Sequence, residues 1–271
     1  MRRKRLDLLL VEQGLLPSQK EAQAAVLAGR VRVDGKRADK PGVLLPPGVT
    51  VAVVPRRPRY VSRGGEKLEH ALRTFGIPVA GRVALDVGAS TGGFTDCLLQ
   101  HGARSVYAVD VGRGQLHWRL RLDPRVHLRE RTHAAHLDAA ALPEPVDLAA
   151  VDVSFISLRR VLPRVVASVR QGGSIVALVK PQFEAPAAVV PRGVVRSPEV
   201  RRQVLLQLAG WVASQGWTLA GMTPSPLTGP KGNREFFFWV VNGPHPTVGD
   251  VDEAIAGMVR ETVAVGGIER L

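Results

Sequence analysis

The stretch that decides the fold is Val83-Ala-Leu-Asp-Val-Gly-Ala-Ser-Thr-Gly-Gly-Phe94. Its apolar run, Val83 to Val87, predicts a buried strand, and the segment after the glycine-rich turn favours a helix from Gly93 to about His101. A strand, a turn and a helix in this order open a doubly wound α/β sheet. We therefore predict an α/β fold for this part of the chain.

The glycine-rich turn indicates the class of ligand. Glycine lets the backbone approach a bound molecule because no Cβ stands in the way. A dinucleotide site needs the pattern G-x-G-x-x-G, whereas this turn reads G-A-S-T-G-G. The spacing D-x-G-x-x-x-G-G is closer to the turns that hold S-adenosylmethionine, which has no pyrophosphate. The candidate cofactor contacts of the turn are Asp86, Gly88, Ala89, Ser90, Thr91, Gly92, Gly93 and Phe94.

A second acid follows the next predicted strand, Ser105 to Val109. This acid, Asp110, is suitably placed to hold ribose hydroxyls. The alternative is that the glycines serve packing alone, and two acids after successive strands count against it. We also take Thr132 as a candidate cofactor contact.

Charge is concentrated near the start of the chain. The 271 residues carry a formal net charge of +13, and residues 1 to 60 contain 13 Lys or Arg and 5 Asp or Glu. This concentration indicates a polyanionic partner such as nucleic acid. The single cysteine, Cys97, suits a reducing cytoplasm, where we expect the protein to act. We predict neither export nor a membrane span, because acids interrupt the early apolar stretch and no apolar run reaches 18 residues.

Residues 1–55 have the pattern of a small α+β domain. The spacing from Leu6 to Gln13 predicts a helix, and Ser18 with Glu21 predicts the capped start of a second helix. The apolar face of that helix should contain Ala22, Ala25, Val26 and Leu27. A basic hairpin turning at Asp34-Gly35 and a strand from Val49 to Val54 should complete the domain.

This arrangement resembles the alpha-L RNA-binding module first seen in a small-subunit ribosomal protein. The matching residues are Arg5-Leu-Asp7, Ser18, Ala22 and Gly29-Arg-Val-Arg-Val-Asp-Gly35. Cations recur across its helix, turn and strand, where they could contact phosphates. A solvated charged surface is the alternative. The candidate RNA contacts are Arg3, Lys4, Arg5, Lys20, Arg30, Arg32, Lys36 and Arg37.

Residues 56–60 should form a basic, proline-stiffened linker, and residues 61–271 a second domain. Strands alternating with helices predict a mostly parallel sheet there. The strands are expected at 125–129, 146–151, 174–179, about 217–222 and 235–241, the last one closing the sheet. Helices are expected at 158–169, 198–215 and 250–262, and 181–197 should be an active-site loop.

Four charged residues stand at or beside the ends of these elements. They are Lys67, Asp152, Lys180 and Glu235. The carboxyl ends of the central strands in such a sheet point at the ligand crevice, and a lysine that closes an apolar strand is unusual for packing alone. A surface ion pair is the alternative for each residue taken singly.

The chain as a whole resembles the TlyA-type proteins, often labelled haemolysins, which join the alpha-L module to an FtsJ-like methyltransferase domain. The motifs are Tyr60-Val-Ser-Arg-Gly-Gly65, Asp86 to Phe94, Asp110-Val-Gly112, Asp152 to Leu158, Val179-Lys-Pro-Gln-Phe-Glu184 and Gly232-Asn-Arg-Glu235. The resemblance implies a Rossmann-like fold, S-adenosylmethionine as cofactor, no metal, and methylation of ribose 2′-hydroxyls in ribosomal RNA or ribosomal subunits. It places a catalytic Lys-Asp-Lys-Glu tetrad on the four residues above, with Lys180 removing the proton of the hydroxyl or orienting it. His133 departs from the asparagine expected there.

Competing functions leave different marks in a sequence. A pseudouridine synthase would need a catalytic aspartate in a Gly-Arg-Leu-Asp-type motif, which is absent. A nicotinamide-dependent oxidoreductase would need the dinucleotide turn, and a pore-forming haemolysin would need a membrane-inserting stretch. A catalytically inactive RNA-binding or ribosome-assembly factor is the strongest alternative, and the intact tetrad counts against it.

Overall fold

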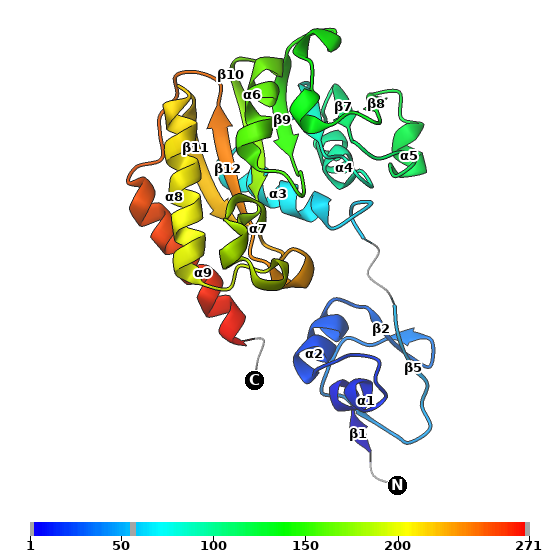
Figure 1. Ribbon diagram of the computed structural model, residues 1–271. Helices are drawn as coiled ribbons and strands as arrows, with labels where there is room; N and C mark the ends of the chain where they lie inside the picture. Colours follow the sequence, from blue (N-terminus) through cyan, green and yellow to red (C-terminus); the bar gives the residue numbers. More distant parts are fainter. Residues whose placement is uncertain (1–2, 55–57, 269–271) are drawn as a thin grey trace. The chain divides into compact units, whose positions relative to one another are not determined.

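The computed structural model describes residues 3–54 and 58–268, without the side chains of residue 230 and residues 263–268. The chain divides into two compact units, Met1–Pro58 and Arg59–Leu271 (Figure 1). Residues 55–57, which include the first two residues of the expected linker, lie outside the described residues, as do residues 1–2 and the tail 269–271.

The first unit contains two short helices and short antiparallel strands around one small core. The core joins Leu6 and Leu10 of α1 to Ala22 and Val26 of α2 and to the strand residue Val31. Ser18 caps α2 as predicted, since its side chain accepts a hydrogen bond from the Glu21 amide. The elements are β1 (Lys4–Arg5), α1 (Leu6–Glu12), α2 (Gln19–Leu27), β2 (Val31–Val33), β3 (Lys36–Arg37), β4 (Leu44–Leu45) and β5 (Val51–Val53).

Two details of this unit differ from expectation. Leu27 was assigned to the apolar face of α2, and this was wrong: it is the last residue of the helix and 68% exposed. The strand expected from Val49 to Val54 is limited to Val51–Val53. The hairpin turn is as predicted, because Asp34 and Gly35 both have positive φ, which a type I′ turn requires.

The second unit is built on a seven-stranded sheet with the order β11-β12-β10-β9-β6-β7-β8. Neighbouring strands from β10 to β8 are parallel, and β12 is antiparallel to both β10 and β11. The strands are β6 (Val83–Val87), β7 (Ser105–Val109), β8 (Val126–Arg129), β9 (Val146–Val151), β10 (Val169–Val179), β11 (Thr218–Pro224) and β12 (Phe236–Val241). The mostly parallel α/β sheet is confirmed, but β12 lies between two strands and does not close the sheet.

Helices cover both faces of this sheet, and each face has its own apolar core. Side chains of α6, α8 and α9 form one core with alternate residues of the central strands, such as Leu85 and Ala149. Side chains of α3, α4 and α5 form the other core with intervening residues, such as Ala84 and Leu148. The helices are α3 (Gly64–Phe75), α4 (Gly93–Gln100), α5 (Trp118–Arg121), α6 (Leu158–Ser168), α7 (Pro181–Glu184), α8 (Pro198–Ser214) and α9 (Val251–Ile268).

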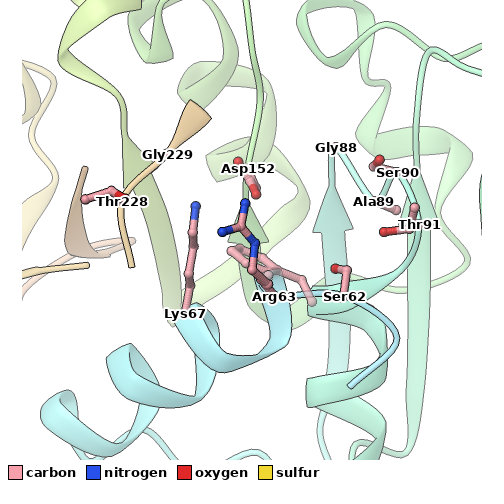
Figure 2. Close-up of a pocket in the computed structure, with 13 residues that line it drawn as sticks. Ser62, Arg63, Lys67, Gly88, Ala89, Ser90, Thr91, Asp152, Thr228 and Gly229 are labelled. Carbon is pink, nitrogen blue, oxygen red and sulfur yellow. The ribbon is translucent and has the colours of Figure 1, made fainter. Parts of the chain in front are cut away.

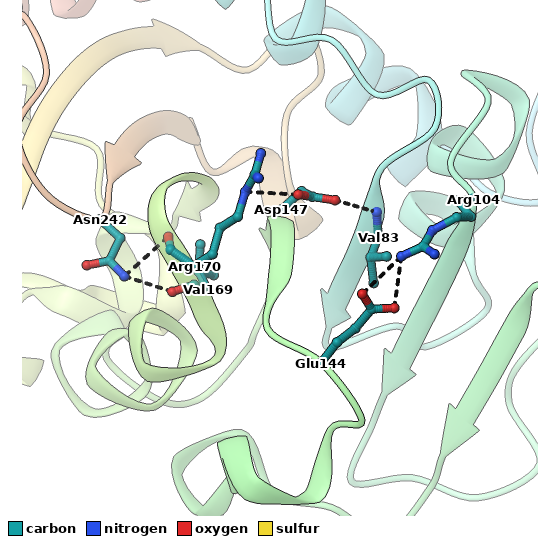
Figure 3. Close-up of polar contacts among 7 residues, drawn as sticks. All are labelled: Val83, Arg104, Glu144, Asp147, Val169, Arg170 and Asn242. Carbon is teal, nitrogen blue, oxygen red and sulfur yellow. Dashed lines mark hydrogen bonds and ion pairs between the residues drawn. The ribbon is translucent and has the colours of Figure 1, made fainter.

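Polar contacts tie the sheet together where its parallel strands begin (Figure 3). Asp147 accepts a hydrogen bond from the Val83 amide at 2.8 Å and pairs with Arg170 at 2.9 Å. The Asn242 amide donates to the Val169 carbonyl at 2.7 Å. These contacts join the amino ends of β6, β9 and β10 to the end of β12. The carboxyl ends of the central strands lie at the opposite edge of the sheet.

The segment expected as an active-site loop is partly ordered into helical turns. It contains α7 and two 3₁₀ turns, Ala187–Val189 and Pro191–Gly193. Further 3₁₀ turns are Ala134–His136, Ala139–Ala141 and Pro230–Gly232. Within the described ranges, no helix combines the length and the apolar character needed to cross a membrane.

Candidate active site

Three adjoining cavities lie at the carboxyl ends of β6, β9 and β10, and Asp152 lines all of them. The turn cavity, about 230 Å³, is lined by Ser62, Arg63, Gly64, Lys67, Gly88, Ala89, Ser90, Thr91, Gly93, Phe94, Asp152, Thr228 and Gly229. The acid cavity, about 380 Å³, is lined by Gly88, Ser90, Val109, Asp110, Val111, Gln115, Thr132, His133, Ala134 and Asp152–Ile156. The lysine cavity, about 440 Å³, is lined by Lys67, Asp152, Ser154, Phe155, Lys180, Gln182, Phe183, Gly193, Lys231, Asn233 and Glu235.

The glycine turn comes within contact of the loop that follows β9. Gly88 has φ +90°, and a Cβ at this position would lie 2.3 Å from the Asp152 carbonyl oxygen. The Gly88 amide donates to the Val109 carbonyl at 2.9 Å, so the turn is also held against the end of β7. Only glycine fits this position, because the Asp152 backbone occupies the place of a Cβ. Gly88 itself lines both the turn and acid cavities.

Two of the predicted turn contacts lie behind the cavity surface. Asp86 is fully buried, and its Oδ2 accepts a hydrogen bond from Thr95 at 2.6 Å. Burial raises the pKa of Asp86 to about 7, the Thr95 bond opposes this shift, and the charge of Asp152 adds to it. Gly92, which precedes α4, has φ +97°, and a Cβ there would lie 2.2 Å from the Leu120 side chain of α5, so this glycine allows the two helices to pack.

Asp110 and Thr132 line the acid cavity together. The Asp110 carboxylate accepts hydrogen bonds from the Ser90 amide at 2.8 Å and from the Gly112 amide at 2.6 Å. Each oxygen keeps acceptor capacity, because an ionised carboxylate offers about four lone-pair sites. Asp110 therefore orders the glycine turn and remains able to accept hydrogen bonds from two neighbouring hydroxyls.

The four charged residues predicted as a tetrad meet in the lysine cavity. Lys67 Nζ lies 2.5 Å from Glu235 Oε2, and Lys180 Nζ lies 2.6 Å from Asp152 Oδ1. The two carboxylates come from residues 83 positions apart, and the two lysines from residues 113 positions apart. Figure 2 shows Lys67 and Arg63 extending from the α3 region toward Asp152, with the glycine turn on the other side of the turn cavity.

Glu235 is held in a closely fitted position. Its side chain is fully buried, and Oε1 has no hydrogen-bond partner among the described residues. A Cβ on Gly229 would lie 2.1 Å from that oxygen, so a larger residue at 229 would displace the carboxylate. Burying a carboxylate is costly unless a cation is paired with it, and Lys67 supplies that cation.

Several residues that line these cavities were not singled out from the sequence. The Ser154 hydroxyl accepts a hydrogen bond from Lys180 Nζ at 2.8 Å. Phe155 is 91% exposed with φ +63° and borders both the acid and lysine cavities. Arg63 lines the turn cavity. All three lie inside the motifs quoted above, so the sequence marked these segments as relevant. The motifs do not show which of their side chains face a cavity.

The candidate RNA contacts fall into two groups. Lys4 pairs with Glu12 at 2.6 Å, Arg5 with Asp7 at 2.8 Å and Arg37 with Asp39 at 2.9 Å. Within the described residues, no ion pair engages Arg3, Lys20, Arg30, Arg32 or Lys36. Three of the eight candidate contacts are thus already paired with acids in the same unit.

Arg5 has a structural task in addition. Its guanidinium holds the pKa of the buried Asp7 carboxyl well below the usual range, and hydrogen bonds from Gln19 and Gln23 lower it further. Asp7 thereby joins α1 to α2. Loss of Arg5 would leave a buried carboxylate without its cation.

Comparison with known proteins finds relatives that match both units of the chain. The family described as FtsJ-like methyltransferase matches residues 60–241, and the S4 domain matches residues 4–51. Among the relatives is the 16S/23S rRNA (cytidine-2'-O)-methyltransferase TlyA of Mycobacterium tuberculosis, 48% identical over 88% of this chain and 90% of that protein. Another is Hemolysin A of Brachyspira hyodysenteriae, 39% identical over 86% of this chain and 97% of that protein. A solved structure of a hemolysin-named protein from Streptococcus thermophilus covers 98% of this chain and 99% of its own, with 38% identity and a TM-score of 0.73.

The sheet, the glycine turn and the cavities at the carboxyl strand ends define the class of S-adenosylmethionine-dependent methyltransferases. Within this class, the chain belongs to the TlyA-type family, in which an S4 domain precedes an FtsJ-like methyltransferase domain.

Proposed function

We propose that the protein is an S-adenosylmethionine-dependent 2′-O-methyltransferase that acts on ribosomal RNA, either in ribosomal subunits or free. The observation that carries the proposal is the meeting of Lys67, Asp152, Lys180 and Glu235 in one cavity that shares Asp152 with the two cavities around the glycine turn. Cytoplasmic action, where ribosomes are assembled, is part of the same proposal.

The residues around the glycine turn fit the cofactor. The backbone of Gly88 lines both cavities around the turn. Asp110 offers acceptors for ribose hydroxyls, and Thr132 lies beside it. Ser90 and Thr91 line the turn cavity, where polar groups suit an amino-acid moiety. When bound there, S-adenosylmethionine supplies a methyl group that is already electrophilic because it is attached to a sulfonium.

The protein has to align an acceptor oxygen with that methyl group and remove a proton from the oxygen. Alignment alone can lower the barrier by roughly 7–11 kcal/mol at best. The lysine cavity would hold the ribose. The unprotonated amine of Lys180 would accept the proton that the hydroxyl oxygen loses as the methyl carbon passes to it from sulfur. Asp152 and Ser154 hold Lys180 Nζ at 2.6 and 2.8 Å, and the Lys67–Glu235 pair forms a wall of the cavity.

Methyl transfer with Lys180→Ala as the matched variant tests this function. The wild type should transfer tritiated methyl groups from S-adenosylmethionine to ribosomal subunits or naked ribosomal RNA, and ribonuclease-resistant dinucleotides would mark 2′-O-methylation. Lys180→Ala should lower turnover by about 10²–10⁴-fold, the usual contribution of a general base. Its dissociation constant for S-adenosylmethionine, measured by calorimetry, should stay close to the wild-type value.

The alternatives give other results. An inactive RNA-binding or ribosome-assembly factor would bind ribosomal RNA without incorporating label. Turnover of Lys180→Ala near the wild-type rate would show that Lys180 neither accepts nor orients the proton.

A further inference from the structure

Two segments that follow neighbouring strands form much of the lysine cavity. Residues 152–157 follow β9, and residues 180–184 follow β10. The pairing of Lys180 with Asp152, and its hydrogen bond to Ser154, both cross from one segment to the other. The distance between the reacting groups therefore depends on how the two segments are held together.

Glu184 provides a second connection between the segments, at the far end of α7. Its Oε2 accepts a hydrogen bond from the Ser157 hydroxyl at 2.6 Å, and its Oε1 accepts one from the Leu158 amide at 2.7 Å. Leu158 is the first residue of α6, where amide groups lack partners within the helix and a negative charge is favourable. Both carboxylate oxygens of Glu184 are thus engaged by the segment after β9.

The segment after β9 needs such support. Phe155 has φ +63°, a conformation that costs free energy for a residue with a Cβ and persists only when surrounding contacts enforce it. Its ring contacts the Phe183 ring at a centroid distance of 5.0 Å. Phe155 is nevertheless 91% exposed, so its own side chain adds little further support.

We propose that Glu184 is a positioning residue for methyl transfer: by holding residues 157 and 158, it sets the place of Asp152 and Ser154 relative to Lys180. This inference rests on the proposed methyltransferase function. Glu184 acts through Lys180 and does not itself line the lysine cavity.

The first test is a set of three variants under saturating cofactor. Glu184→Ala should lower kcat at least about tenfold, because displacing reacting groups by about 1 Å can cost as much as 10²-fold. Glu184→Gln should keep most of the wild-type kcat, because its amide oxygen can accept a hydrogen bond from the Leu158 amide and its amide nitrogen can donate one to the Ser157 hydroxyl. Glu144→Ala is the matched control, since Glu144 is half exposed and pairs with Arg104 at 2.9 Å where the strands begin. That control should keep wild-type kcat.

The second test separates positioning from general stability. In single turnovers, Glu184→Ala should add almost no further loss to Lys180→Ala, because a residue that acts through Lys180 has nothing left to position. Full additivity of the two losses, or a Glu184→Ala enzyme with wild-type kcat, would overturn the inference. If Glu184→Ala does not fold, Ser157→Ala replaces it, because this variant removes one of the two hydrogen bonds to Glu184. It should likewise lower kcat and add almost no further loss to Lys180→Ala.

The wild-type assay distinguishes failure of the proposed function from failure of the positioning role of Glu184. A wild type that transfers no methyl group to any ribosomal RNA substrate would refute the proposed function. A wild type that is active, with Glu184→Ala and Ser157→Ala equally active, would refute the positioning role alone.

Discussion

The carboxyl group of Asp86 lies in the interior of the methyltransferase unit beside Thr95. Its Oδ1 has no hydrogen-bond partner among the described residues, and burial raises its pKa from the ordinary 3.8 to about 7. A carboxyl group in this setting changes its protonation state within the pH range in which the protein would be assayed.

The stability of the protein should therefore depend on pH through Asp86. In the window between the unfolded and folded pKa values the folded chain binds more protons at this position, so the free energy of unfolding falls as pH rises through it. The loss should not exceed about 4 kcal/mol, since each pKa unit corresponds to about 1.4 kcal/mol. Asp86→Asn should lack this contribution and should gain stability relative to the wild type as pH rises.

Urea unfolding of the wild type and Asp86→Asn across this window gives the difference directly. Asparagine can still accept the hydrogen bond from Thr95, so the variant isolates the charge. A constant difference in unfolding free energy from about pH 5 to about pH 8, which covers the upper part of the window, would contradict the assignment.

The types of residue at the site could be predicted from the sequence, but the ion pairs and hydrogen bonds that they form could not. A lysine that ends an apolar strand and a proline after it marked Lys180. Its pairing with Asp152 and the pairing of Lys67 with Glu235 depend on which strands are neighbours. The Ser154 contact with Lys180 escaped prediction because a serine in a loop has no pattern that shows where its hydroxyl points.

At the scale of elements, the turn between β6 and α4 connects the fold to the function. The hydrogen bonds of Gly88 and Ala89 to the Val109 carbonyl hold this turn to β7, at 2.9 and 3.1 Å. The Asp152 amide donates a hydrogen bond to the Val87 carbonyl at 2.9 Å, which holds the start of the turn to the loop after β9. A change in this turn should therefore disturb the turn and acid cavities, which Gly88 lines.

Gly88→Ala tests the turn, with Gly172→Ala as its control. Both glycines have positive φ, but a Cβ at Gly172 would meet no atom within 4 Å. The two variants share the conformational cost, and Gly88→Ala adds the clash with the backbone of Asp152. We expect it to be less stable than Gly172→Ala by about 1–3 kcal/mol, as for other overpacked sites, and to bind S-adenosylmethionine more weakly.

Chemical unfolding and calorimetry measure these two effects. Equal unfolding free energies for the two alanine variants, with unchanged cofactor affinity, would show that the turn can move away from Asp152 without cost.

Periodicity predicted most elements because local spacing of apolar residues specifies them. It did not predict that β12 pairs with β10 and β11, since hydrogen bonding between strands is a long-range choice. It also missed the short helical turns in 181–197, which bury few apolar side chains and leave no periodic signal.

At the scale of the whole molecule, function divides between a cationic S4 unit and a methyltransferase unit. Lys20, Arg32 and Lys36 form no ion pair within the described residues, whereas Lys4 and Arg37 are paired with acids. Cations that are already neutralised should contribute less to phosphate binding than the unpaired ones.

Substituting Lys20, Arg32 and Lys36 together by Ala should weaken binding to ribosomal RNA. It should also reduce the slope of log affinity against log salt by up to about 2–3, because each phosphate contact contributes about 0.7–0.9. The paired control, Lys4→Ala with Arg37→Ala, should change the slope less per residue removed. Affinity for S-adenosylmethionine should be unchanged in both.

A salt titration of RNA binding by filter retention or fluorescence anisotropy checks this. An unchanged slope for the triple variant would show that the S4 unit contacts RNA through other groups. A larger effect per residue from the paired control would show that the ion pairs open on binding.

Taken alone, the sequence determined the type of domain at each end of the chain, the strand-turn-helix unit at Val83 to Phe94, and the four charged residues that we propose as catalytic. These features depend on local spacing, on glycine's lack of a Cβ and on the charge of individual side chains. Only the tertiary structure decided that Asp152 borders all three cavities, that Lys67 faces Glu235, and that Glu184 joins two loops. Such contacts arise from strand order and loop packing between residues far apart in the chain, which no local pattern encodes.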